Sequence, residues 1–436
     1  MSEKMQYVKS GIFSYSGKIV TIFSSFVYTF LIANYLGPEQ YGLVNYYISF
    51  TLGLIGVFGV YFLGGLVNVF MPKWKSKTFL RYVLCAVSFL SVMLFVFMVL
   101  FSKDISVFLG RSNDQLLQLT AFLLLIMPSI VIYTALFRSF KMFGKELKFH
   151  SIVAVLNLVL AFALVIVFDF GVWGVVYAMV LSNLAGLVLI IYQSRFLKYV
   201  DKPINFSEIK KYSLFGVPAT FFHRIDGQML LVFMGFFLAD SALGLYYVAF
   251  KIASLLLSLP VNTLCEILLP YVSGYAADKH KLARYVSLSI KFSLIITLIL
   301  SLLVILFSKF ILIILFPEYV ACYSFIVLFT VMFLISSVNP LISLFLSLNR
   351  MDIIMRSYFG GFMSTLVFGL LLIPWLGVYG LIFTQILNTF FSRGILVYYL
   401  KAVDFEVDII PKMRDFRYFW SSLKDVFSVG LNRLKN

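Results

Sequence analysis

Three ionisable side chains occur close together in an otherwise apolar stretch of the sequence. His223, Arg224 and Asp226 lie within Phe215-Gly-Val-Pro-Ala-Thr-Phe-Phe-His-Arg-Ile-Asp-Gly, and a further apolar run follows. A charged side chain at the centre of a membrane-spanning helix costs about 2.5 to 3.5 kcal/mol on insertion scales. We therefore expect this stretch to face water, a partner helix or a ligand.

The spacing of these residues separates their roles. At about 100° per residue, Arg224 and Asp226 differ by about 200° around a helix, so they cannot both face one cavity. We assign Arg224 to a cavity and Asp226 to a structural or proton-linked role. His223 suits either hydrogen-bonded packing or the transfer of a proton.

Four more ionisable residues fall inside apolar spans: Lys18, Lys251, Glu266 and Arg393. The basic groups outnumber the acidic ones, so a space lined by all of them would be cationic. Arginine binds a diphosphate bidentately, and lysine binds it as a point charge. The alternative is that these side chains extend to the lipid headgroups at the nearer membrane surface.

Composition identifies the class of protein. Of the 436 residues, 62% are hydrophobic and 12% are charged, whereas a soluble domain carries roughly 25% charged residues. The chain is therefore a polytopic membrane protein. The net charge of +16 does not indicate nucleic acid binding, because membrane proteins concentrate Lys and Arg on the cytoplasmic side.

Apolar runs long enough to cross a bilayer predict twelve helices, since a core of about 30 Å needs about 20 residues. The fold class expected is all-α, with two parallel six-helix lobes. The predicted spans are 11–35, 41–70, 79–101, 116–137, 150–168, 172–194, 213–238, 245–270, 288–316, 320–348, 357–374 and 378–400.

The distribution of basic residues predicts the orientation. Only three of the 35 Lys and Arg residues, Lys103, Arg111 and Lys309, fall in connections on one side. That side is predicted to be the outer one, with both termini cytoplasmic. We expect a multi-pass protein of the cell (inner) membrane.

The two halves of the chain repeat one another. Leu36-Gly-Pro-Glu-Gln-Tyr-Gly-Leu is matched by Leu238-Ala-Asp-Ser-Ala-Leu-Gly-Leu, so that Gly42 corresponds to Gly244. Parallel repeats of this kind are related by an axis along the membrane normal. The domains predicted are lobes at 1–194 and 213–400, a cytoplasmic linker at 195–212, and a cytoplasmic tail at 401–436 that carries an interfacial amphipathic helix.

Prolines interrupt four predicted spans, at Pro128, Pro218, Pro260 and Pro340. Pro128 and Pro340 occupy corresponding places in the two halves, which is typical of broken helices near a transport pathway. We interpret the four as hinges. The alternative is a set of tolerated kinks, which are common in membrane helices.

Motifs for catalysis and cofactors do not occur at credible spacing. The sequence has no P-loop, no nucleophile elbow and no His–Cys ligand cluster, so we expect no enzyme activity, no metal and no cofactor. The three cysteines are far apart and suggest small core residues.

Several short motifs carry a resemblance to a known family. They are Ala33-Asn-Tyr-Leu-Gly-Pro-Glu-Gln-Tyr-Gly-Leu, Phe215-Gly-Val-Pro, Asp226 followed by Leu243-Gly-Leu-Tyr, Leu269-Pro and Gly377-Val-Tyr-Gly. On these motifs the chain resembles the polysaccharide-type flippases of lipid-linked oligosaccharides (O-antigen and capsule flippases, Wzx-type). These belong to the multidrug/oligosaccharidyl-lipid/polysaccharide exporter superfamily. The two additional helices typical of lipid II flippases are missing.

The resemblance implies a V-shaped, alternating-access transporter with a central cationic cavity and no use of ATP. In such proteins Lys18 and Arg224 occupy helices that line the cavity. The substrate implied is a polyprenyl-diphosphate-linked oligosaccharide, delivered to the outer leaflet for surface polysaccharide such as O-antigen, a component of lipopolysaccharide. Membrane lipid, a polysaccharide polymerase and glycosyltransferases are the other expected partners. The alternative function is a cation-coupled multidrug exporter of the same superfamily.

Overall fold

The structure is a computed structural model. It describes residues 3–111, 113–140, 142–197, 199–200, 204–274, 279–348, 350–402 and 407–409. Side chains are described from residue 20, and those of 143, 259–260, 262–264, 266–267, 269–281 and 402 are not. The predicted amphipathic helix of the tail lies outside the described residues.

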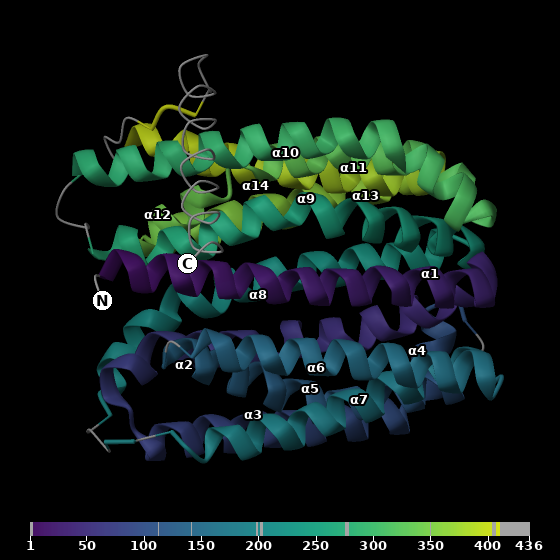
Figure 1. The fold of residues 1–436 in the computed structure, drawn as a ribbon, viewed down its shortest axis with the longest axis horizontal. Helices are drawn as coiled ribbons and strands as arrows, with labels where there is room; N and C mark the ends of the chain where they lie inside the picture. Colours follow the sequence, from purple (N-terminus) through teal and green to yellow (C-terminus); the bar gives the residue numbers. More distant parts are fainter. Residues whose placement is uncertain are drawn as a thin grey trace, which may run out of the picture.

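Helices make up all the regular secondary structure of the described residues, and they run side by side along the long axis of the molecule (Figure 1). The first, α1 (Glu3–Val57), contains two spans joined without a loop. At the junction Gly37 has a φ of 72° and a ψ of 171°. Glycine adopts this conformation without the steric cost that a Cβ would add, and Pro38 follows it directly.

The remaining helices of the first half form the N-terminal lobe together with the first helix. A π-helical turn, η1, continues α6, and Ser76 and Asn113 cap α3 and α5 by accepting hydrogen bonds from backbone N–H groups. These helices are α2 (Val60–Trp74), α3 (Lys77–Leu100), α4 (Ser102–Phe108), α5 (Asp114–Ser139), α6 (Phe143–Ala161), η1 (Phe162–Val167) and α7 (Gly171–Ser194).

The second half forms the C-terminal lobe. Its η2 is a 3-10 turn, and a break at 337–339 separates α11 from α12. The elements are α8 (Phe206–Phe237), α9 (Asp240–Gly274), α10 (Lys279–Leu315), η2 (Pro317–Cys322), α11 (Tyr323–Ser336), α12 (Pro340–Ser347), α13 (Met351–Leu376) and α14 (Val378–Ala402).

The two lobes form separate bundles in Figure 1, with α1 and α8 between them. One apolar core, around Phe137 and Phe149, belongs to the N-terminal lobe, and another, around Phe345 and Leu396, to the C-terminal lobe. A third core combines residues of both lobes. The predicted all-α, two-lobed fold class is confirmed. The domain boundaries remain predictions.

Ten helical segments of the described residues are long and apolar enough to cross a membrane, and the protein is a multi-pass membrane protein. The predicted count of twelve is not confirmed. Val20–Val57 is one segment but contains the junction at Gly37. The charged helix α8 is not among the ten.

The predicted hinge prolines lie in different settings. Pro128 and Pro218 are inside continuous helices, α5 and α8, whereas Pro340 is the first residue of α12, directly after a helix break. Pro260 falls within the span of α9, and its side chain lies outside the described part. Their role as hinges remains a prediction.

Candidate functional site

Arg224 lies where the two lobes meet. The Cζ atom of its guanidinium is 3.8 Å from the centroid of the Tyr61 ring, which belongs to α2 of the other lobe. A Cβ on Gly56 would lie only 2.8 Å from Arg224 Cδ. Glycine at position 56 therefore leaves the space through which the arginine stem reaches Tyr61.

The guanidinium keeps unused hydrogen-bonding capacity. Arg224 Nε is buried and has no hydrogen-bond partner among the described residues, and no described carboxylate forms an ion pair with this side chain. A ring stacked on a guanidinium covers its face and leaves the N–H donors at its edge unused. The arrangement suits an anionic ligand that approaches this edge.

Gln228 extends the same face of α8 by one turn. Its Nε2 atom lies 1.1 Å from the position that a Cβ on Gly53 would occupy, so the amide fills the notch left by that glycine. Gln228 Oε1 is buried without a hydrogen-bond partner in the described part of the chain. Residues four apart on a helix share a face, and here that face is turned toward α1.

Asp226 points to a different set of helices. Its Oδ2 accepts a hydrogen bond from Asn388 Nδ2 at 2.9 Å, and the same Nδ2 donates to Thr365 Oγ1 at 3.0 Å. These partners belong to α14 and α13, on the inside of the C-terminal lobe. Asp226 Oδ1 is buried with no partner among the described residues. The carboxyl group is thus separated from the Arg224 face, as a rotation of about 200° requires.

His223 and Arg393 lie close enough in the C-terminal lobe to interact electrostatically. The His223 ring stacks on Tyr358, with centroids 4.4 Å apart and an interplanar angle of 21°. Arg393 Nη1 donates to Ser392 Oγ at 3.2 Å, while its Nε is buried without a described partner.

The other predicted site residues are not brought into this group by any described contact. Lys251 is half-buried on α9, and no described carboxylate lies within ion-pair distance of it. The side chains of Lys18 and Glu266 lie outside the described residues. The assignment of Lys18 and Lys251 to the cavity, and of Glu266 to a coupling or structural role, remains a prediction.

Sequence reasoning missed the partners of the charged residues. Tyr61, Gln228, Asn388 and Thr365 carry no charge, so the search for ionisable groups within spans passed over them. One signal was available. Gly53 and Gly56 are three residues apart and so lie on one face of a helix, where the missing side chains leave space for Gln228 and Arg224.

At the predicted outer end the lobes are in direct backbone contact. A Cβ on Gly42 would lie 1.9 Å from Asp240 O, and one on Gly244 would lie 1.9 Å from Pro38 O. The two glycines correspond to one another in the sequence repeat. Each therefore packs on the turn of the opposite lobe, as a pseudo-twofold axis between the lobes requires.

Solved structures share this architecture. The inward closed conformation of the lipid II flippase MurJ has a TM-score of 0.73 and 14% identity, covering 98% of this chain and 93% of that chain. An inward-facing multidrug resistance MATE family transporter of the MOP superfamily has a TM-score of 0.67 and 14% identity, covering 90% of this chain and 98% of that chain. A MOP superfamily transporter from Pyrococcus furiosus has a TM-score of 0.70 and 15% identity, covering 91% of this chain and 95% of that chain.

A search of curated proteins gave no significant match. A family model described as "Polysaccharide biosynthesis protein" matches residues 31–324, which include the turn at Gly37, the Arg224 site and all of η2. The chain belongs to this polysaccharide biosynthesis protein family and has the fold of the MOP superfamily transporters.

Proposed function

We propose that the protein is a flippase that moves polyprenyl-diphosphate-linked oligosaccharide units from the cytoplasmic to the outer leaflet of the cell membrane. The observation that carries the proposal is Arg224. It lies between the lobes, stacked on Tyr61, and no described carboxylate neutralises it. Membership of the polysaccharide biosynthesis family supports the class of substrate.

The chemistry of the substrate matches this site. A diphosphate accepts two parallel hydrogen bonds from the edge of a guanidinium, and the apolar polyprenyl chain can remain in lipid. The sugars then pass between the lobes. MurJ, which shares the fold, is a flippase of lipid II.

The membrane potential favours the outward step. When the inside is negative, moving one negative charge outward releases about 2.3 kcal/mol per 100 mV, provided that no cation accompanies it. The unit delivered to the outer leaflet would be the substrate of a polymerase. Glycosyltransferases on the cytoplasmic side, where both termini are predicted to lie, would supply it.

A cation-coupled multidrug exporter is the second candidate. The hydrogen-bonded carboxyl group of Asp226 favours it, because a buried carboxyl group can bind and release a proton or cation during transport. Structures of MATE family transporters share the fold. Export of cationic dyes that depends on Asp226 and is unaffected by Arg224→Ala would favour this candidate.

Substitution of Arg224 tests the flippase. In cells whose own flippase has been deleted, Arg224→Ala should abolish surface polysaccharide while the protein still inserts, and Arg224→Lys should retain part of the export. Arg356→Ala is the matched control, because Arg356 donates to Tyr399 Oη on an exposed part of the C-terminal lobe. Near-normal export by Arg224→Ala would refute the role of this residue.

A further inference from the structure

Arg111, at the predicted outer end, has no part in the transport site described above. It is one of only three Lys and Arg residues that the sequence assigns to outer connections. Its side chain is 10% exposed. Basic residues are scarce on the outer side of membrane proteins, and a buried charge must be paired to be tolerated. A nearly buried arginine on the outer side therefore needs specific partners that neutralise its charge.

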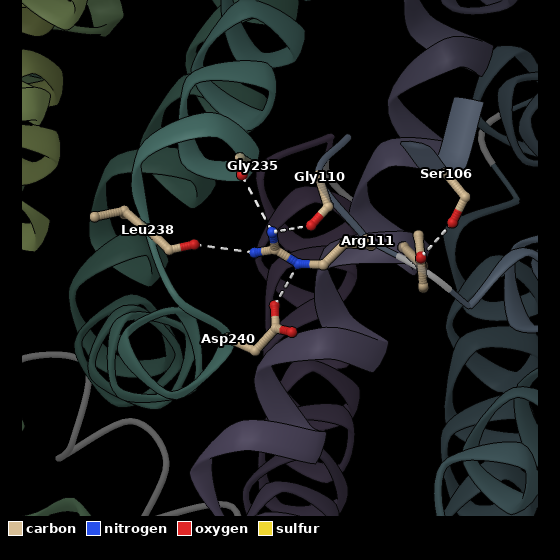
Figure 2. A network of polar contacts seen from close by, with 7 residues as sticks. Ser106, Gly110, Arg111, Gly235, Leu238 and Asp240 are labelled. Atoms are coloured by element: carbon tan, nitrogen blue, oxygen red, sulfur yellow. Dashed lines mark hydrogen bonds and ion pairs between the residues drawn. The ribbon is translucent and has the colours of Figure 1, made fainter. Parts of the chain in front are cut away.

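The guanidinium of Arg111 spans the two lobes (Figure 2). It extends from the connection between α4 and α5 of the N-terminal lobe. Nε donates to Asp240 Oδ1 at 2.6 Å, Nη1 donates to Gly235 O at 3.1 Å, and Nη2 donates to Leu238 O at 3.0 Å. All three acceptors belong to the C-terminal lobe. A fourth bond, from Nη1 to Gly110 O at 3.1 Å, stays within its own lobe.

These acceptors occupy a helix terminus that needs a donor. The last carbonyl groups of a helix have no intrahelical partner, and the C-terminus carries partial negative charge. Gly235 lies in the last turn of α8, and Leu238 is its C-cap. Arg111 caps α8 from the opposite lobe and pairs with Asp240, the first residue of α9.

The packing around this network requires close approach of the two backbones. A Cβ on Gly235 would lie 2.9 Å from Leu109 O and 2.1 Å from Tyr46 Oη. The Tyr46 ring lies 5.2 Å from Arg111 Cζ. We call Arg111 and its three acceptors in the C-terminal lobe the Arg111 clasp.

The corresponding contact on the other side of the pseudo-twofold axis has no ion pair in the described residues. There η2 and the end of α10 meet the turn in α1. Tyr319 Oη donates to Ala33 O at 2.9 Å, and Asn34 Nδ2 donates to Leu315 O at 2.7 Å. Both contacts join the end of a helix in one lobe to the other lobe, but among the described residues only the Arg111 clasp contains an ion pair.

We propose that Arg111 is a gating residue of the transport cycle. Its three bonds to the C-terminal lobe hold the outer end closed, and all three break when the lobes separate there. This proposal rests on alternating access by the proposed transporter, whatever its substrate. The strength of the clasp then sets the fraction of molecules that are open to the outside.

Cross-linking across the gate tests the proposal. Phe108 and Phe236 come from opposite lobes, their ring centroids are 5.4 Å apart, and both are 55% exposed. Cysteines placed at these two positions, in a chain whose Cys85, Cys265 and Cys322 are replaced by serine, report closure when a short thiol cross-linker is added to purified protein. Arg111→Gln should slow cross-linking about tenfold, the loss expected when charge-assisted hydrogen bonds between the lobes are removed.

Two further variants make the result specific. Lys103→Gln removes a predicted outer charge outside the clasp and should leave cross-linking unchanged. The exchange Arg111→Asp with Asp240→Arg should restore part of the rate lost by Arg111→Gln, because it rebuilds the ion pair but not the helix cap. Unchanged cross-linking in Arg111→Gln would overturn the proposal.

The assay contains no substrate, so its result is separate from the flippase. Slower cross-linking in Arg111→Gln would support the gating role of the clasp. Normal polysaccharide export in cells lacking the protein would reject the proposed flippase function, and the two results can occur together. If Arg111→Gln fails to fold, Arg111→Lys decides the question. Lysine keeps the charge of arginine but not its forked geometry. A cross-linking rate below that of the parent protein would support the clasp, and a rate equal to that of the parent would overturn it.

Discussion

The ring of Tyr61 determines the orientation of the Arg224 guanidinium. Tyr61 covers one face of the guanidinium across the boundary between the lobes, and its own side chain is partly exposed at 37%. Stacking fixes the plane of the guanidinium without consuming any of its N–H donors. The arginine is therefore oriented before a diphosphate arrives, which lowers the entropic cost of binding.

Two substitutions at Tyr61 test this orientation. Tyr61→Phe keeps the ring and should export polysaccharide at close to the parental rate. Tyr61→Leu keeps an apolar side chain but removes the π face, and a cation–π contact is worth about 0.5 to 2 kcal/mol. We expect export by Tyr61→Leu to fall several-fold, measured as the initial rate of surface polysaccharide formation. Equal rates for the two variants would show that only the volume of residue 61 matters.

The separation of Arg224 from Asp226 could be predicted from the sequence, because it follows from helical geometry alone. Their partners could not. Asn388 is 162 positions from Asp226, and no local pattern specifies which distant helix packs on which face. The cavity role of Lys18 and the coupling or structural role of Glu266 depend on side chains outside the described residues and remain predictions.

At the scale of helices, the backbones of the two lobes touch at Gly42 and at Gly244, and each glycine packs on the turn of the opposite lobe. The nearest atoms to a Cβ on either glycine belong to the backbone of the opposite turn, and a backbone cannot move aside as a flexible side chain does. These two positions therefore require glycine for close packing.

Alanine substitution at Gly42 should weaken the closed outer end. Its Cβ would lie 1.9 Å from Asp240 O, and overpacking of this kind costs about 1 to 3 kcal/mol. We expect a lower midpoint of thermal unfolding in detergent. Gly227→Ala in α8 is the control. Nothing lies within 4 Å of a Cβ there, and alanine is favoured over glycine in a helix by roughly 0.5 to 1 kcal/mol. Destabilisation of similar size in both variants would contradict the packing argument.

Hydropathy predicted the existence of most helices but not their interruptions. The predicted span 41–70 is broken at Gly59, where φ is 84° and α2 begins. The predicted span 320–348 is divided into η2, α11 and α12. The first break contains Phe58 and Gly59, and the break between α11 and α12 contains Ser337, Val338 and Asn339. Both lie within long apolar runs, and a hydropathy average over such a run does not register backbone dihedral angles. Pro340 coincides with the start of α12, and Gly59 coincides with the break before α2.

At the scale of the whole molecule, the predicted orientation and the cationic site together imply transport that responds to membrane potential. In proteoliposomes with the protein inserted in one direction, an inside-negative potential should increase delivery of the lipid-linked oligosaccharide to the outer leaflet. The expected gain is about 2.3 kcal/mol per net charge per 100 mV, which exceeds a tenfold change in the equilibrium distribution. A potential set by potassium and valinomycin provides the measurement.

A proton gradient imposed without a potential is the control. If delivery follows the proton gradient and ignores the potential, the cycle carries a neutralising cation with the diphosphate. Asp226, with its hydrogen bonds to the inner helices of the C-terminal lobe, would then be the first residue to examine.

The paired glycine contact also bears on how this chain assembles. Gly42 of the first half packs on Asp240 of the second half, and Gly244 of the second half packs on Pro38 of the first. Each half of the polypeptide therefore contributes one glycine surface and one turn surface. Two fragments divided at Asp201-Lys-Pro would retain both surfaces. The contact between the halves at these turns therefore does not depend on the covalent connection at that point.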